Sequence, residues 1–164
     1  MKNSFLHKGL CLLAALMMVC VSSCAMAQAA QMDGASLITL REQPDSGAKV
    51  LGRFFSGAQV EILGDAGNGF KQVALGTGMG TVSGYVMTEY LASQAQVSAI
   101  KTAHVASPYG TQSVVLRSRP SNSYDAVAML MVGDSVLIIG EMGEFRYVQT
   151  GSGCVGCLLE SELK

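Results

Sequence analysis

The stretch that decides the fold is GAQVEILG at residues 57–64, because it returns as GDSVLIIG at residues 133–140. Polar and apolar residues alternate in the first copy, as they do along a half-buried strand. The glycine at each end and the valine between them recur in one register, since Gly57, Val60 and Gly64 return as Gly133, Val136 and Gly140. A fixed register of this kind predicts that one structural unit is duplicated along the chain.

The repeat continues on both sides of that stretch. The motif LRxxP at residues 40–44 returns at residues 116–120, in the same register as the glycines. Downstream the spacing between matched residues shortens slightly, as expected if hairpin turns differ in length: Phe70 returns as Phe145 and Gly84 as Gly156. Each copy spans roughly 55–60 residues, which is enough for a small barrel with one core.

Residues 1–27 have the composition of a secretory signal peptide. Lys2 and Lys8 precede an uncharged apolar run from Leu10 to Val21, and the segment ends Ala-Met-Ala before Gln28. The apolar run is shorter than the roughly 20 residues that a membrane-spanning helix needs. Residues 21–24, VSSC, resemble a bacterial lipobox, so Cys24 is a lipidation candidate. Free secretion and a lipid anchor both remain open, and either predicts an exported protein.

Charge and composition exclude some partners and activities. Removing Lys2 and Lys8 from 11 basic residues leaves nine against 12 acidic ones, a net charge of −3 with no basic stripe, which excludes nucleic acid as a partner. Only one histidine, His104, follows the signal segment. We therefore expect no catalytic constellation, metal site or cofactor.

Short segments rich in β-branched and aromatic residues, separated by glycine- and proline-rich turns, predict an all-β chain. In the first copy we expect strands at residues 36–40, 50–55, 59–63, 70–73 and 82–87, closed by a helical turn or strand at 88–91. In the second copy we expect them at 114–116, 127–132, 135–139, 145–149 and 154–159. Residues 92–100 are a predicted linker, and residues 101–105 either extend it or open the second copy as a strand.

These motifs, together with GYV at residues 84–86 and Tyr90-Leu91, resemble bacterial SH3-like (SH3b) domains. The resemblance implies two tandem SH3-like barrels, at residues 36–91 and 101–163. It also implies a non-catalytic module that contacts cell-wall peptidoglycan or its peptides. The alternative is an envelope adaptor that binds an extended segment of a partner protein.

In SH3-like barrels, the loops equivalent to those after Arg41 and Arg117 flank a shallow groove with nearby aromatic residues. The resemblance therefore implies seven ligand-binding candidates: Arg41, Phe70, Tyr85, Tyr90, Arg117, Tyr124 and Tyr147. A core role is favoured for Phe70, because large aromatic residues anchor small cores. In the second copy, Cys157 and Glu162 stand where the first has Tyr85 and Tyr90, so we expect the first copy to bind more strongly.

Cys154 and Cys157 form a C-x-x-C pair in the last predicted strand. In a straight strand, residues three apart lie about 10 Å from each other and face opposite sides, which is too far for a disulfide. A bend at Gly156 would bring them together. A disulfide and two reduced thiols therefore both remain open.

Overall fold

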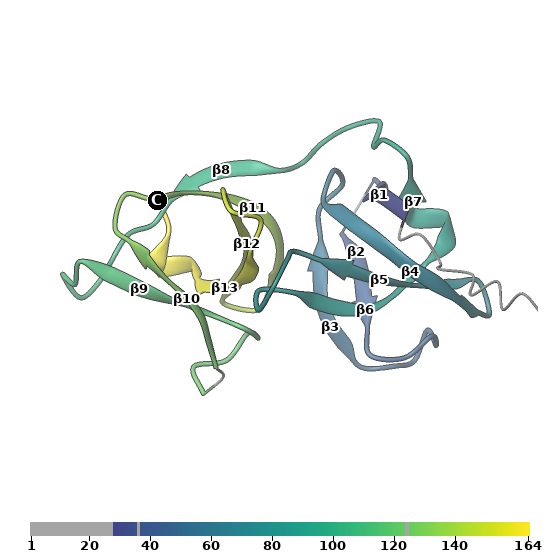
Figure 1. The fold of residues 1–164 in the computed structure, drawn as a ribbon, viewed down its shortest axis with the longest axis horizontal. Helices are drawn as coiled ribbons and strands as arrows, with labels where there is room; N and C mark the ends of the chain where they lie inside the picture. Colours follow the sequence, from purple (N-terminus) through teal and green to yellow (C-terminus); the bar gives the residue numbers. More distant parts are fainter. Residues whose placement is uncertain (1–27, 36, 124) are drawn as a thin grey trace, which may run out of the picture.

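The computed structural model describes residues 28–35, 37–123 and 125–164, which form short β-strands joined by turns (Figure 1). The predicted signal segment with Cys24, and the binding candidate Tyr124, lie outside the described residues. Thirteen strands make one antiparallel sheet, and the helical turns within the described ranges are two 3-10 segments of three residues each. The predicted all-β fold class is confirmed.

The strands fall into two groups along the chain. The first unit, residues 28–92, contains β1 (Gln28–Met32), β2 (Ile38–Arg41), β3 (Val50–Phe54), β4 (Gln59–Gly67), β5 (Phe70–Leu75), β6 (Val82–Met87), the 3-10 turn η1 (Thr88–Tyr90) and β7 (Leu91–Ala92). The second unit, residues 101–164, contains β8 (Lys101–His104), β9 (Ser113–Arg117), β10 (Ala126–Met131), β11 (Ser135–Met142), β12 (Phe145–Thr150), β13 (Val155–Leu159) and the 3-10 turn η2 (Glu160–Glu162). Residues 101–104 are thus a strand, one of the two alternatives left open.

Strand pairing repeats from one unit to the next. β2 pairs with β3 and β6, and β9 pairs with β10 and β13. β5 lies between β4 and β6 as β12 lies between β11 and β13. β1 and β8 occupy equivalent places, pairing with the outer sides of β4 and β11. The sequence repeat therefore reappears as a repeated topology.

The repeated glycines occupy equivalent places. The β4–β5 ladder shifts register between Ile62 and Gly64, and the β11–β12 ladder shifts between Ile138 and Gly140. A β-bulge of this kind bends the strand and interrupts regular pairing. The bulge therefore lies at the same point of the repeat in both units.

Close approach explains another repeated glycine pair. A Cβ on Gly84 would lie 2.8 Å from Leu40 Cγ, and a Cβ on Gly156 would lie 2.6 Å from Leu116 Cγ. Both distances are below van der Waals contact, so each position needs a glycine for its strand to pack over the leucine.

β1 was not predicted, because its sequence QAAQM has no β-branched or aromatic residue. It forms a strand because its register with β4 and β7 buries Ala30 and Met32 in the first unit. Tertiary packing here outweighs weak strand propensity.

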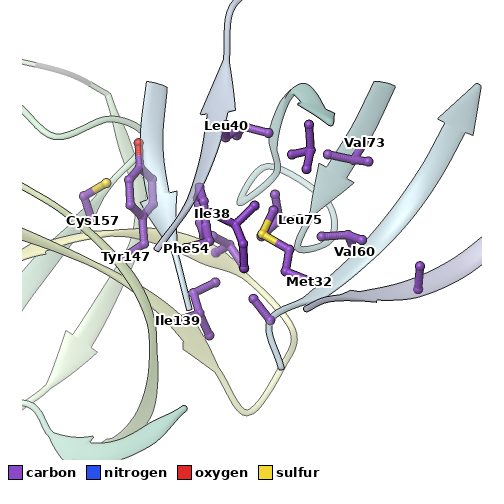
Figure 2. Packing of buried hydrophobic residues seen from close by; sticks show 14 residues of the cluster. Met32, Ile38, Leu40, Phe54, Val60, Val73, Leu75, Ile139, Tyr147 and Cys157 are labelled. Carbon is purple, nitrogen blue, oxygen red and sulfur yellow. The ribbon is translucent and has the colours of Figure 1, made fainter. Parts of the chain in front are cut away.

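The two units meet through apolar side chains. The hydrophobic cluster of the first unit includes four residues of the second: Ile139, Tyr147, Val155 and Cys157. Figure 2 shows Tyr147 between Cys157 and Phe54, with Ile139 near the same core. A separate cluster around Val105, Leu116, Val148 and Leu158 fills the second unit.

Backbone pairing joins the units at the same place. β3 pairs antiparallel with β11, with Phe54 opposite Gly140 and Arg53 opposite Glu141. The amide of Phe55 donates to the carbonyl of Ile139 at 2.9 Å, and a Cβ on Gly140 would lie 2.5 Å from the carbonyl oxygen of Arg53. Glycine at position 140 therefore permits the close approach of the two strands.

The connecting residues are held against the first unit. The amide of Ala95 donates to Gln31 Oε1 at 2.8 Å, and the amide of Ala99 donates to the carbonyl of Ser56 at 2.9 Å. These bonds order a segment whose small polar residues predicted a linker.

Candidate functional site

A groove of about 280 Å³ lies where the two units meet. The first unit supplies residues 49–51 from the start of β3 and residues 81–83 from the start of β6. The second unit supplies the loop residues 118–120, Met142 of β11 and Tyr147 of β12. Because both units contribute, the groove depends on how they are docked.

The side chains around the groove favour an acidic ligand. Lys49 and Arg119 bring two positive charges, and the hydroxyls of Thr81, Ser83 and Ser118 can donate hydrogen bonds. No aspartate or glutamate is among the described residues that line it. Valine, leucine, proline and methionine side chains complete the wall, which suits a small ligand with both carboxylate and aliphatic groups.

Tyr147 forms a fixed part of this groove. Its side chain is 2% exposed, and its hydroxyl donates to the carbonyl oxygen of Leu51 at 2.5 Å. The ring centroid lies 4.8 Å from that of Phe54, with the planes tilted by 39° (Figure 2). A Cβ on Gly52 would lie 2.5 Å from Tyr147 Cε2, so glycine there makes room for the ring.

Tyr147 is one of the predicted binding residues, and the structure gives it a packing role. Its ring is used by the contact between units, which leaves almost no surface for a ligand. A tilted aromatic pair of this kind adds about 0.5–1.5 kcal/mol beyond the burial of its area.

Cys157 lies beside Tyr147 and is fully buried. Burial raises the pKa of the Cys157 thiol to about 12, although the Tyr147 hydroxyl and the Arg117 charge oppose the rise. Burial also raises the pKa of Tyr147. Since the thiolate is the reactive form of cysteine, Cys157 is protonated and inert at neutral pH.

Arg41 and Tyr85 lie directly opposite each other on β2 and β6. Arg41 Nη1 donates to the carbonyl oxygen of Ala48 at 2.8 Å, so its side chain closes the loop after β2. Tyr85 is half-buried and keeps part of its ring accessible on the outer face of the first unit. The structure thus brings these two candidates together, with Arg41 holding the loop.

Phe70 and Tyr90 differ in exposure. Phe70 is 5% exposed and lies in the interior, as the core interpretation predicted, so it lines no surface. Tyr90 is 37% exposed in η1, and a hydrogen bond with Glu89 raises the pKa of its hydroxyl. Tyr90 is therefore accessible to a ligand, whereas Phe70 is not.

Arg117 is paired internally. Its Nη1 lies 3.1 Å from Glu162 Oε2, and the same carboxylate oxygen accepts the amide of Leu159 at 2.9 Å. The two side chains are only 15% and 6% exposed. Arg117 therefore fixes the end of β13 and η2 and is not available to a ligand.

Glu162 had no predicted role beyond the loss of an aromatic residue. A signal for this role was present in the sequence. Glu162 replaces Tyr90 at the end of the second unit, and the same unit carries Arg117, the repeated arginine, which needs an acidic partner. Opposite charges at two repeat positions would have predicted this ion pair.

Both cysteines of the C-x-x-C pair are free thiols, and β13 is a continuous strand through Gly156. Cys154 is half-buried just before the strand, with Sγ 3.8 Å from the carbonyl oxygen of Thr77. His104 Nδ1 lies 3.2 Å from Ser135 Oγ on the exposed β8–β11 ladder.

Within residues 28–35, 37–123 and 125–164, no three His, Cys, Asp or Glu side chains are grouped to hold a metal ion. The same residues include no helix long and apolar enough to cross a membrane.

Comparison with known proteins identifies the first unit. Residues 35–92 match the family model of the bacterial SH3 domain. The SH3-like resemblance is thereby confirmed for this part of the chain, and for the second unit it stays a prediction. The sequence matches none of the curated proteins.

Two solved structures resemble the chain in the arrangement of its backbone. NlpC1 from Trichomonas vaginalis is 18% identical with a TM-score of 0.38, and NlpC2 from the same organism is 16% identical with a TM-score of 0.36. Each comparison covers 84% of this chain, which spans about half of each of those chains, 45% and 48%.

Proposed function

We propose that this protein is an exported, non-catalytic binding module that contacts cell-wall peptidoglycan or its peptides. The bacterial SH3 match at residues 35–92 supports the class of module. We also propose that the second unit is another SH3-like copy, since its strand pairing follows the same order and register.

The observation that carries the proposal is the junction groove, with two cationic side chains and no carboxylate among the described residues of its lining. Peptides of the cell wall present free carboxylates next to small aliphatic side chains. Lys49 and Arg119 would attract the carboxylates, and Val50, Val82 and Met142 would contact the aliphatic groups. Tyr85 and Tyr90 on the first unit offer further aromatic surface.

The proposed location follows from residues 1–27, interpreted as a signal segment that is removed on export. Cys24 would anchor the protein to a membrane if it is acylated, and otherwise the protein would be secreted or periplasmic. Radiolabelled fatty acid supplied to cells separates these cases, since only an acylated Cys24 retains the label.

Sedimentation with purified cell-wall sacculi tests the proposal. We expect the wild type to pellet with sacculi, and the double variant Lys49→Glu, Arg119→Glu to stay in the supernatant, because it turns the attractive charges repulsive. The double variant Lys101→Glu, Lys164→Glu is the matched control, since it makes the same charge change at two exposed residues that do not line the groove. Wild-type protein that pellets no more than an unrelated protein would overturn wall binding.

The alternative function is an envelope adaptor that binds an extended segment of another protein. It is favoured by the position of β10 at the end of the sheet, where a strand edge is exposed. Crosslinking that recovers one specific partner, combined with no binding to sacculi, would favour the adaptor.

A further inference from the structure

The chain itself shows how one strand edge of this fold is covered. In the first unit, β3 would end the sheet, but the bulged part of β11 pairs with it at Gly140 and Glu141. Ile139, in the same bulge, is 3% exposed because it packs into the core of the first unit. The second unit therefore covers the β3 edge of the first unit with an aliphatic residue, Ile139, and the glycine that follows it, Gly140.

The equivalent edge of the second unit is uncovered. Met129 and Leu130 of β10 face Val115 and Val114, just as Arg53 and Phe54 of β3 face Thr39 and Ile38. Among the described residues, no strand pairs with the other side of β10.

Apolar side chains and a groove lie along this uncovered edge. Met129 is 71% exposed and Met131 is 51% exposed. A groove of about 400 Å³ runs beside the edge, between residues 128–130 and the hairpin at residues 150–152. Exposed apolar groups beside unpaired backbone form a template for another strand.

The strand segment that matches this edge is also uncovered. β1 covers β4 only from Gln59 to Ile62, as β8 covers β11 only from Ser135 to Ile138. Beyond that point, Leu63 stands at the position equivalent to Ile139 and is 40% exposed. A Cβ built on Gly64, the equivalent of Gly140, has no neighbour within 4 Å. Leu63 and Gly64 of the first unit are therefore the uncovered equivalents of Ile139 and Gly140, through which the second unit contacts the first.

We propose that the protein associates with a second copy of itself, head to tail, through these two edges. The bulge of β4 in one copy pairs with β10 of the next, with Gly64 opposite Leu130 and Asp65 opposite Met129. Leu63 then packs beside Leu130 as Ile139 packs in the contact within the chain. This inference stands apart from the proposed wall binding.

The differences between the two contacts are compatible with this arrangement. Gly52 is needed within the chain because a Cβ there would meet the ring of Tyr147. Ala128 replaces Gly52 on β10, but Gln72 replaces Tyr147 on β5, so no ring meets the alanine. Asp65 is already paired with Lys71 at 3.0 Å, so its charge is balanced when it faces Met129.

Such a contact is heterologous and does not close on itself. The surface used on one copy differs from the surface used on its neighbour. A chain of copies therefore always keeps one free edge at each end, to which a further copy can bind. The contact within the chain is favoured by the short connection at residues 93–100, which the contact between copies lacks. Association between copies should therefore depend on concentration and produce open chains of increasing length.

Two blocking variants test the proposal by sedimentation velocity over a range of concentrations. Met129→Lys places a charge on the β10 edge, and Leu63→Lys places one on the β4 bulge. Both positions are exposed, so folding should be preserved, and circular dichroism checks this. Wild-type protein should show a mean mass that rises with concentration, whereas each variant alone should stay monomeric because every contact needs both edges.

An equimolar mixture of the two variants should form a dimer and nothing larger, since only one intact pair of edges is available. Val97→Lys, at a position 72% exposed in the connecting segment, is the control and should associate like the wild type. Wild-type protein that is monomeric at all concentrations would overturn the proposal without affecting wall binding. Association of Leu63→Lys alone would also overturn it, because the occupant of β10 would then not be β4.

Discussion

The same outer face is accessible in the first unit and covered in the second. In the first unit, Arg41, Tyr85 and Gln72 form one row across β2, β6 and β5, and Tyr85 remains partly accessible. In the second, the equivalent row is Arg117, Cys157 and Tyr147, and the last two are buried at the junction.

The residue types follow this difference in environment. A buried position between units favours a small thiol and a ring that fills space, whereas the open face keeps an amide and a partly exposed tyrosine. The arginines diverge as well, since Arg41 holds a loop carbonyl and Arg117 holds a buried carboxylate. The repeated topology gives two equivalent faces, and docking covers one of them and leaves the other accessible.

The largest expected effect comes from removing the ring at the junction. Tyr147→Ala should lower the free energy of unfolding by about 3–5 kcal/mol, because it leaves a cavity beside Phe54 and removes the bond to the Leu51 carbonyl. Chemical denaturation measures this.

The matched change Gln72→Ala, at the equivalent open position, should alter the free energy of unfolding by less than about 0.5 kcal/mol. Equal losses for the two variants would contradict the assignment of one face to docking and the other to solvent.

The second effect concerns the closing residue of each unit. Glu162→Ala should destabilise the protein by about 3 kcal/mol, because it leaves Arg117 largely buried without its carboxylate. Tyr90→Ala, at the equivalent position of the first unit, removes a partly exposed ring and should cost less. Thermal unfolding of both variants checks the order, and a smaller shift for Glu162→Ala would show that the ion pair is not needed.

Stability should also fall in alkaline solution because of Cys157. Its pKa is about 12 when folded, while its ordinary value is 9.0, so the unfolded chain releases the proton first. This contribution is fully present below about pH 9 and is lost as the pH rises toward about 12. Cys157→Ala should flatten the decline of the unfolding free energy over that range, and an unchanged slope would argue against burial of the thiol.

A smaller effect is expected on ligand binding. Tyr85→Ala should weaken binding to sacculi or to soluble wall peptides by about 1 kcal/mol, roughly a fivefold change, because it removes accessible aromatic area. Cys157→Ala, whose side chain is buried, should leave the affinity unchanged wherever the protein is folded. Isothermal titration calorimetry measures both, and equal losses would contradict the assignment of the accessible aromatic surface to the first unit.

Much of the fold was predictable because the repeat carries local information. The glycines at 57, 64, 133 and 140 and the alternating residues between them fix strands and bulges, and all the predicted strands are present. β1 was missed since its alanines and glutamines form a strand only through pairing with β4. Residues next to turns and strands in sequence were easier to assign than those defined by distant contacts.

The site was less predictable, because sequence periodicity does not reveal which face of a duplicated unit is covered by the other copy. Tyr147 was predicted to bind a ligand, and its ring is instead 2% exposed at the junction. The groove itself combines residues from 49–51 with residues near 119, so no single motif contains it. Only docking of the two units brings Lys49 and Arg119 to one groove.

Thiol labelling tests the central claim most directly, by placing the same probe on both faces in protein purified without residues 1–27. The Cys154→Ser variant has one thiol, at Cys157 on the docked face. The variant Cys154→Ser, Cys157→Ala, Tyr85→Cys has one thiol at the equivalent position of the open face. We expect the thiol at position 85 to react with an alkylating reagent in the native protein, and Cys157 to react at least about 100-fold more slowly until the protein unfolds. Similar rates at the two positions would contradict the docking of the second unit onto the first.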